Sequence, residues 1–356
     1  MESLPDIYYI LLDSYARADT LEEAFGYDNS EFLDFLKQKG FFIADGSLAN
    51  YTQTDLSLAS SLNLNYLDEL AAAVGPEARD RRPLEKLIQD NRVVGFLKQQ
   101  GYTVAGLASG YSATDLKKAE VHVSAARSWN EFEIRLLCST PIPWLALRES
   151  VLDPYEMHRQ KILYTLDHIA GTAQLPSPHF VFAHVLAPHA PFVFDGQGNA
   201  IQPQGEYDLR AGTLQDGPGP LGDEDPKGYT GQLTFINHKI MSVLDDLLSQ
   251  SSQPTIVILQ GDHGPGPLLS WDDPNNRYVK ERLAILNAYL LPGNGGEDLY
   301  EEITPVNTFR MIFNQYLGTE LAPLADRSYV SSWERPYSFR DVTEDLRSAA
   351  TARHSE

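Results

Sequence analysis

The feature that most constrains this chain is a short apolar run that ends in two side chains able to bind a metal. Residues 255–260 are β-branched or apolar over about the length of one strand, and Gly261-Asp262-His263-Gly264 follows directly. Such a run is typical of a strand buried on both faces of a sheet. Open α/β sheets keep their ligand sites at the carboxyl ends of their strands. Taken alone, the segment fits a metal site or a strand-end turn with a helix-capping Asp262.

Three further apolar runs extend this pattern. They are 7–12 before Asp13, 180–183 before His184 and His189, and 284–291 before Pro292. Polar groups at the ends of several parallel strands converge on one edge of a sheet, so we expect the Asp and His side chains to meet there. A purely structural protein has little reason to repeat this placement.

The rest of the chain alternates between strand and helix patterns. The predicted helices cover 30–39, 54–67, 84–100, 156–170 and 232–249, and further short strands are predicted at 41–43 and 102–107. This βαβ alternation predicts an α/β fold with a mostly parallel central sheet covered by helices on both faces.

Composition excludes some classes of function. The 356-residue chain has 42% hydrophobic and 22% charged residues, which is ordinary for a globular protein, but its formal net charge is −21. Nucleic-acid binding needs clustered Lys and Arg, so nucleic acid is an unlikely partner, as is an anionic membrane face. A single cysteine, Cys138, allows no internal disulfide, and its apolar context predicts a buried, inert thiol. No apolar run reaches the ~18 residues of a membrane span.

Thr54 stands where a helix pattern begins, within Thr54-Asp-Leu-Ser57-Leu-Ala-Ser60. A hydroxyl at a helix N-terminus lies beside free backbone N–H groups and the positive end of the helix dipole, which favour an alkoxide or a bound phosphate. The simpler interpretation is a Thr54 N-cap, with Asp55 or Ser57 completing the first turn. The local sequence favours the cap.

The order of these motifs resembles the alkaline phosphatase/sulfatase superfamily. It is most similar to the branch that includes lipoteichoic acid synthases and phosphoethanolamine transferases. The motifs are Asp13, Thr54-x-x-Ser-x-Ala-Ser60, Pro188-His189-Ala-Pro-Phe192 and Gly261-Asp-His-Gly264. The resemblance spans nearly the whole chain and implies a three-layer sandwich of the alkaline phosphatase/sulfatase type.

The resemblance also implies roles for individual residues. Asp13, Asp262 and His263 match metal ligands, and Thr54 matches the nucleophile that also contacts the metal. His189 matches the histidine that holds the transferred group or assists the leaving oxygen. Weaker candidates for substrate binding are Ser57, His184, which is alternatively a satisfied strand-end histidine, and Arg282, which is alternatively a surface arginine. A site of this kind suits one divalent ion, Zn²⁺ or Mn²⁺, and leaves a second ion open.

The chain departs from the arylsulfatase pattern in ways that bear on the reaction. Asp13-Ser14 replaces the usual pair of aspartates, Thr54 replaces the cysteine that becomes formylglycine, and Leu56 and Leu58 replace the Pro and Arg of the signature. We therefore expect a phosphoryl- or phosphodiester-transfer enzyme that uses a threonine nucleophile and acts on a lipid- or glycan-linked phosphate substrate. The alternatives are a sulfatase or phosphatase-type hydrolase of the same superfamily, and an inactive binding module.

Domain boundaries and location follow from the same resemblance. We expect residues 1–320 to form the catalytic domain and 321–356 a C-terminal extension with a frayed tail. A Gly-, Pro- and Asp-rich loop at 195–228 follows the His189 motif, and it is either a flap over the site or an inert insertion. Many members of the branch follow membrane helices, so we expect an extracytoplasmic domain whose membrane anchor lies outside this chain.

Overall fold

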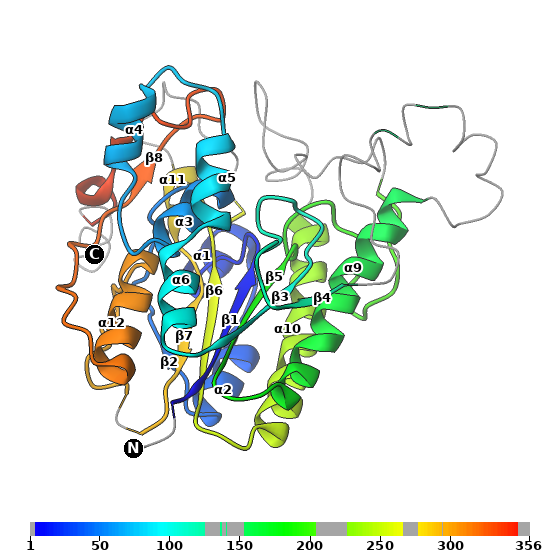
Figure 1. The fold of residues 1–356 in the computed structure, drawn as a ribbon. Coiled ribbons are helices and arrows are strands. Elements are labelled where there is room, and N and C mark those ends of the chain that lie inside the picture. Colours follow the sequence, from blue (N-terminus) through cyan, green and yellow to red (C-terminus); the bar gives the residue numbers. More distant parts are fainter. Residues whose placement is uncertain are drawn as a thin grey trace.

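A computed structural model describes residues 4–124, 136, 140, 153–203, 226–265, 277–293 and 295–347. Across these residues seven strands form one sheet in the order β2-β7-β6-β1-β5-β3-β4 (Figure 1). The strands are β1 (Asp6–Leu12), β2 (Phe42–Ile43), β3 (Thr103–Leu107), β4 (Val121–Val123), β5 (His179–Val185), β6 (Thr255–Gly261) and β7 (Asn287–Leu290). A separate pair, β8 (Tyr329–Val330) and β9 (Arg340–Asp341), is antiparallel. The predicted α/β class is confirmed.

The centre of the sheet is parallel and fully buried. β1 lies between β5 and β6, and every residue of these three strands is buried. Both faces of these strands are covered, which explains why they appear in the sequence as continuous apolar runs rather than as alternating ones.

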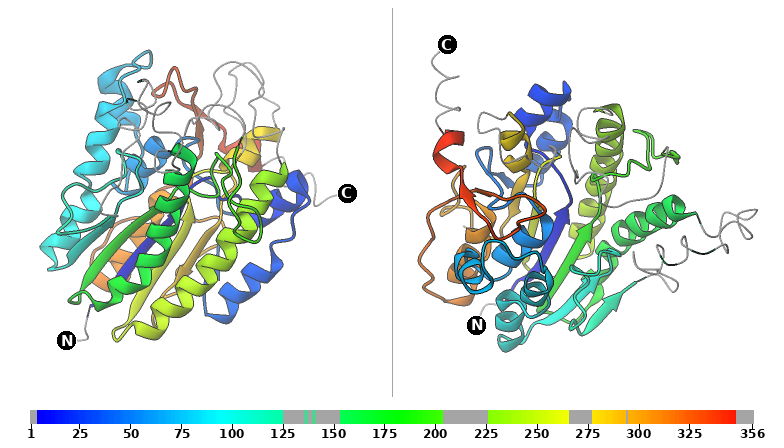
Figure 2. Two further views of the ribbon diagram at one scale, coloured as in Figure 1. Left: turned by 90° about the vertical axis from the view of Figure 1, so that its right-hand side faces the viewer. Right: turned by 90° about the horizontal axis from the view of Figure 1, so that it is seen from above.

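Helices cover both faces of the sheet, as the turned views show (Figure 2). Tyr8, Ile10 and Leu12 of β1 pack toward α2, α9 and α10, and the alternate residues Ile7 and Tyr9 pack toward α3, α5, α6 and α12. The helices are α1 (Ala18–Phe25), α2 (Ser30–Gln38), α3 (Thr54–Ser61), α4 (Asp68–Val74), α5 (Arg82–Gln89), α6 (Arg92–Gln99), α9 (Pro154–Ile169), α10 (Pro226–Gln250), α11 (Arg277–Leu283) and α12 (Pro305–Leu317), with the 3₁₀ helix η2 (Ala170–Gln174). The predicted three-layer sandwich is confirmed.

Two predicted helices differ from the observed ones. The stretch 54–67 is helical only to Ser61, and Leu64 adopts a positive φ of 54°. The stretch 84–100 divides into α5 and α6, because the Asn91 side chain accepts a hydrogen bond from Val94 N (2.8 Å) and starts a new helix.

The fourth apolar run also differs from its prediction. Only Asn287–Leu290 is a strand, and β7 runs antiparallel to β6. Its amino end, rather than its carboxyl end, therefore lies at the edge where the parallel strands finish. This reversal brings Arg282, which precedes β7, to that edge.

Other predictions fall partly outside the described residues. Within the predicted loop 195–228, residues 226–228 belong to α10, and 204–225 lie outside the described residues, as do Cys138 and the tail 348–356. The boundary at residue 320 stays a prediction. Among the described residues, no helix is both long and apolar enough to cross a membrane.

Candidate active site

The sheet register brings two acidic residues together. Leu12 of β1 pairs with Gly261 of β6, so the next residues, Asp13 and Asp262, leave neighbouring strands side by side. Ser14 has a φ of 63°, and this left-handed turn accompanies a hydrogen bond from its backbone N–H to Asp262 Oδ1 (3.1 Å). A short hydrogen-bonded turn thus fixes the spacing of the two carboxylates.

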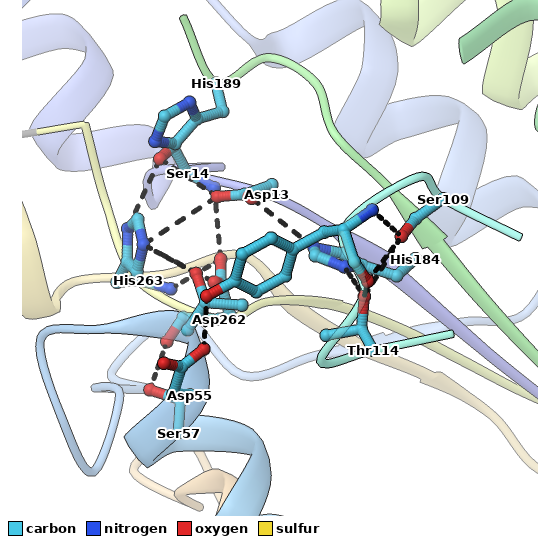
Figure 3. Close-up of polar contacts among 12 residues, drawn as sticks. Asp13, Ser14, Asp55, Ser57, Ser109, Thr114, His184, His189, Asp262 and His263 are labelled. Carbon is cyan, nitrogen blue, oxygen red and sulfur yellow. Dashed lines mark hydrogen bonds and ion pairs between the residues drawn. The ribbon is translucent and has the colours of Figure 1, made fainter. Parts of the chain in front are cut away.

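His263 Nε2 lies at the centre of the cluster (Figure 3). It is 3.7 Å from Asp13 Oδ1, 3.4 Å from Asp262 Oδ2 and 3.3 Å from Thr54 Oγ1. Asp13, Asp262 and His263 are buried, and their ligand atoms lie within 4.8 Å of one another. The three predicted metal ligands and the predicted nucleophile thus come together from β1, β6 and α3.

The hydrogen bonds around the cluster leave ligand atoms available. His263 Nδ1 lies 2.9 Å from the Gly264 carbonyl oxygen and donates to it, so Nε2 carries the lone pair, which faces the cluster and also lies 3.1 Å from Arg282 Nη2. Asp262 Oδ1 accepts from two backbone N–H groups, whereas the buried Oδ2 has no hydrogen-bond partner among the described residues. An unsatisfied buried carboxylate oxygen facing an imidazole lone pair fits a divalent cation.

The pKa shifts within the cluster also favour a bound cation. Burial and the charge of Asp13 raise the pKa of Asp262 to about 6. Burial also opposes ionisation of Asp13, but His189, His184 and His263 together lower its pKa below the usual range. Burial and then Arg282 hold the pKa of His263 well below its ordinary value, so its imidazole is neutral. Two buried carboxylates beside a neutral imidazole carry more negative charge than the neighbouring buried Arg282 offsets, and a divalent cation would supply the difference.

Thr54 is not the cap of its helix. Gln53 occupies the cap position of α3 with extended backbone, and its side chain makes no capping bond. Thr54 is the first residue inside the helix, and its hydroxyl lies beside His263. The capping alternative for Thr54 is therefore wrong.

Ser57 holds α3 against the end of β6. Its hydroxyl lies 2.9 Å from the backbone oxygens of both Tyr51 and Asp262. These contacts position the helix that carries Thr54. A contact between Ser57 and substrate stays a prediction, and the hydroxyl proton is already engaged by backbone.

His184, near the carboxyl end of β5, and His189, which follows the strand, take different positions. His189 lines the pocket described below, its backbone N–H donates to Asp13 O (3.0 Å), and its Nδ1 lies 2.5 Å from Ala190 O. His184 is fully buried, with Nδ1 2.8 Å from Thr114 Oγ1 and Nε2 3.4 Å from Asp13 Oδ2. His184 therefore lies behind Asp13 rather than in the pocket.

Arg282 is buried, which corrects the alternative of a surface arginine. Its exposed fraction is 1%, and its guanidinium donates to Thr52 O (2.8 Å) and Gly264 O (3.2 Å), with Nη2 3.1 Å from His263 Nε2. Burial lowers the pKa of Arg282 to about 10, which leaves the side chain charged at neutral pH. A fixed positive charge thus lines the site beside the predicted nucleophile.

A pocket of about 330 Å³ opens over Thr54, His189 and His263. Its far wall carries residues that the sequence analysis did not select, among them Asp55, Arg81, Tyr111 and Trp333. Arg81 pairs with Asp55 (3.2 Å) and its guanidinium carbon lies 3.6 Å from the centre of a Trp333 ring. Tyr111 donates to the other Asp55 oxygen.

The family model for sulfatases matches residues 5–311, which is most of the chain. The chain belongs to the sulfatase family. The match, together with the seven-stranded sheet of the described residues, confirms the predicted membership of the alkaline phosphatase/sulfatase superfamily. No curated protein sequence matches this sulfatase-family chain.

Solved structures share the fold of this sulfatase-family chain at low identity. The periplasmic domain of EcEptC from Escherichia coli, in complex with Zn, matches with a TM-score of 0.58 and 11% identity, over 96% of this chain and 93% of that one. The periplasmic domain of the phosphoethanolamine transferase EptC from Campylobacter jejuni gives 0.51 and 13%, over 89% and 90%. A 2-O GAG sulfatase gives 0.55 and 12%, over 99% and 90%. At these identities the likeness shows the fold alone.

The residues missed in this sulfatase-family site share one property. Arg81, Tyr111 and Trp333 come from loops that are far from the four motifs in the sequence and meet only in the folded chain. Asp55 was the exception, because it directly follows Thr54 and was considered only as part of a cap.

Proposed function

We propose that this protein is a metal-dependent enzyme that transfers a phosphoryl or phosphodiester group through Thr54. The observation that carries the proposal is the position of the Thr54 hydroxyl, 3.3 Å from His263 Nε2 at the start of a helix that Thr54 does not cap. A hydroxyl with no capping role, and no backbone partner among the described residues, is held here beside paired carboxylates and an imidazole, which is a position suited to chemistry.

The proposed metal ligands are Asp13, Thr54, Asp262 and His263. The unsatisfied Asp262 Oδ2 and the His263 lone pair support this set, and a zinc complex is known for one structure of the same fold. Zn²⁺ or Mn²⁺ at this point would lower the pKa of a bound hydroxyl and offset charge on phosphorus. One ion accounts for the cluster of described ligands.

Three residues of the chain have separate roles in the proposed reaction. The Thr54 hydroxyl gives its proton to water and its Oγ1 attacks phosphorus in line; the new O–P bond forms as the bond to the leaving oxygen breaks, giving phosphothreonine. His189 lines the pocket and can hold a proton for the leaving oxygen or contact a non-bridging oxygen. Arg282 supplies a fixed positive charge for the phosphate. Water or an acceptor alcohol then releases the group from Thr54.

The residue at position 54 favours phosphorus over sulfate. Threonine cannot become formylglycine, so the hydrated-aldehyde route of arylsulfatases is closed to this chain. A threonine ester of phosphate is stable enough to be passed to a second alcohol, which suits transfer. Sulfate ester hydrolysis remains the second candidate, because the family match and the GAG sulfatase fold include that chemistry.

The substrate class is inferred from the pocket, and the cellular location from the matching structures. The pocket of about 330 Å³ extends past the cluster to Arg81 and Trp333, which leaves room for a group beyond the phosphate. We therefore propose a lipid- or glycan-linked phosphate or phosphodiester as substrate. Two of the matching structures are periplasmic domains, which supports an extracytoplasmic location with an anchor outside this chain.

A comparison of three esters tests the reaction class. Purified protein loaded with Zn²⁺ or Mn²⁺ is assayed with bis-p-nitrophenyl phosphate, p-nitrophenyl phosphate and p-nitrophenyl sulfate. We expect turnover of at least one phosphate ester well above the sulfate ester, and loss of that turnover in Thr54→Ala but only partial loss in Thr54→Ser. Sulfate turnover well above both phosphates would overturn the proposal, and no turnover of any ester with metal bound would favour a binding module.

A further inference from the structure

One short loop contacts two parts of the candidate site: His184, which lies behind Asp13, and α3, the helix that carries Thr54. Residues 109–115 belong to the connection between β3 and β4 and lie outside all four sequence motifs. Asp115 Oδ1 holds the loop in shape by accepting from Ser109 N (2.8 Å), Ser109 Oγ (3.1 Å) and Gly110 N (3.3 Å). From this loop Thr114 contacts His184 (Figure 3). Tyr111 of the same loop donates to Asp55 on α3, the helix that carries Thr54.

His184 links this loop to Asp13. Its ring is completely buried, and on one side Nδ1 is hydrogen-bonded to Thr114 Oγ1 (2.8 Å). On the other side Nε2 lies 3.4 Å from Asp13 Oδ2, an ion-pair contact that falls short of hydrogen-bond geometry in this structure. The ring does not line the pocket, so it can act on the reaction only through Asp13. Asp13 presents its other oxygen, Oδ1, toward His263 (3.7 Å).

The donor and acceptor roles along this chain follow from Asp13. A metal-binding carboxylate carries no proton and can only accept, so the nitrogen facing it, His184 Nε2, must carry the hydrogen. His184 Nδ1 then has a lone pair and must accept from the Thr114 hydroxyl. Thr114 Oγ1 also lies 3.0 Å from Ser109 Oγ, whose own proton is directed to Asp115 Oδ1. His184 and Thr114 therefore each have one role, His184 as donor to Asp13 and Thr114 as donor to His184.

We propose that His184 is a positioning residue: held in one tautomer by Thr114, it fixes Asp13 Oδ2 so that Oδ1 faces the metal. The inference rests on the proposed metal site but not on the proposed reaction. Groups that orient metal ligands in this way typically contribute about 10–100-fold to metal affinity. The predicted contact of His184 with substrate is replaced here by a contact with a ligand.

The affinity for Zn²⁺ alone tests this role, measured by competition with a chelator of known affinity, with no substrate present. His184→Leu removes the donor, and we expect Zn²⁺ affinity to fall about 10-fold or more. His184→Gln can still direct an N–H toward Asp13 and should stay within a few-fold of wild type. Thr114→Val should weaken binding severalfold, whereas Thr114→Ser should not. Tyr111→Phe is the matched control, because it alters the same loop without touching His184.

The possible results distinguish a failure of the role proposed for His184 from a failure of the proposed reaction. The proposal is overturned if His184→Leu binds Zn²⁺ as wild type does, or if His184→Gln loses as much affinity as His184→Leu. If circular dichroism shows that His184→Leu does not fold, the two Thr114 variants decide, and equal Zn²⁺ affinity in them would overturn the proposal. Failure of the proposed reaction would appear differently, as an absence of Thr54-dependent turnover with this pattern of affinities intact.

Discussion

At the scale of single residues, the site depends on which atoms the surrounding hydrogen bonds turn toward the cluster. His263 Nδ1 donates to a backbone carbonyl, and Asp262 Oδ1 accepts from two N–H groups, so His263 Nε2 and Asp262 Oδ2 face each other at 3.4 Å. The types of these residues and their position after β6 were predictable from the sequence. The partners that orient them, Gly264 and Ser14, were not, because such contacts depend on the exact path of the turns.

Asp262→Ala should remove most of the bound metal. The variant loses the carboxylate whose Oδ2 faces the cluster, and the remaining ligands offer one negative charge fewer. We expect about one Zn²⁺ or Mn²⁺ per wild-type chain by elemental analysis after dialysis, and little in the variant. Asp34→Ala, at an exposed position on α2, is the control and should match wild type. Equal metal in wild type and Asp262→Ala would contradict the ligand assignment.

Ser57→Ala distinguishes a structural serine from a substrate contact. The hydroxyl bonds to backbone oxygens on both sides of it, so its loss should lower the free energy of unfolding by about 1–3 kcal/mol. Urea denaturation measures this loss, and KM at a temperature where both proteins are folded should change little. A large rise in KM without loss of stability would instead support the predicted contact with substrate.

At the scale of elements, the parallel strands could be predicted and the edge of the sheet could not. β1, β5 and β6 are buried on both faces and therefore appear as apolar runs, whereas the direction of β7 depends on the path of the chain before it. That path is tight, because a Cβ at Gly264 would collide with the backbone oxygen of Glu281 in α11. Because Gly264 packs directly against Glu281, the next residue, Arg282, lies at the site.

The same substitution should have opposite effects at two glycines. Gly264→Ala places a Cβ against backbone that cannot move freely, so we expect a loss of stability of about 1–3 kcal/mol or more and weaker metal binding. Gly95→Ala lies inside α6 at an exposed position with nothing within 4 Å, and should stabilise by about 0.5–1 kcal/mol. Thermal or urea denaturation checks both signs. A neutral Gly264→Ala would mean that the turn is less constrained than described.

At the scale of the whole molecule, the pocket is assembled from segments that the sequence keeps far apart. Thr54, Arg81, Tyr111 and Trp333 line one cavity, and nothing local to Arg81 or Trp333 distinguishes them from surface residues. The four motifs were predictable because each carries its own chemistry next to a strand or helix end. The far wall was not, since it depends on how the loops pack.

The net charge of −21 should affect how an anionic substrate approaches. Repulsion by the whole molecule is screened as the Debye length falls from about 30 Å at 0.01 M salt to about 8 Å at 0.15 M. We expect kcat/KM for bis-p-nitrophenyl phosphate to rise over this range while kcat stays nearly constant, because salt acts on encounter rather than on the buried cluster. A falling kcat/KM would show that the three arginines lining the pocket, Arg81, Arg82 and Arg282, dominate the approach instead.

The covalent state of Thr54 tests the central claim most directly. Wild type and Thr54→Ala, both loaded with metal, are mixed with bis-p-nitrophenyl phosphate, quenched in acid within a turnover, and examined by peptide mass spectrometry. We predict a p-nitrophenyl phosphoryl group on Thr54 in wild type, formed as one p-nitrophenolate leaves, and no adduct or turnover in Thr54→Ala. Continued turnover by Thr54→Ala, or an adduct on another residue, would contradict the account.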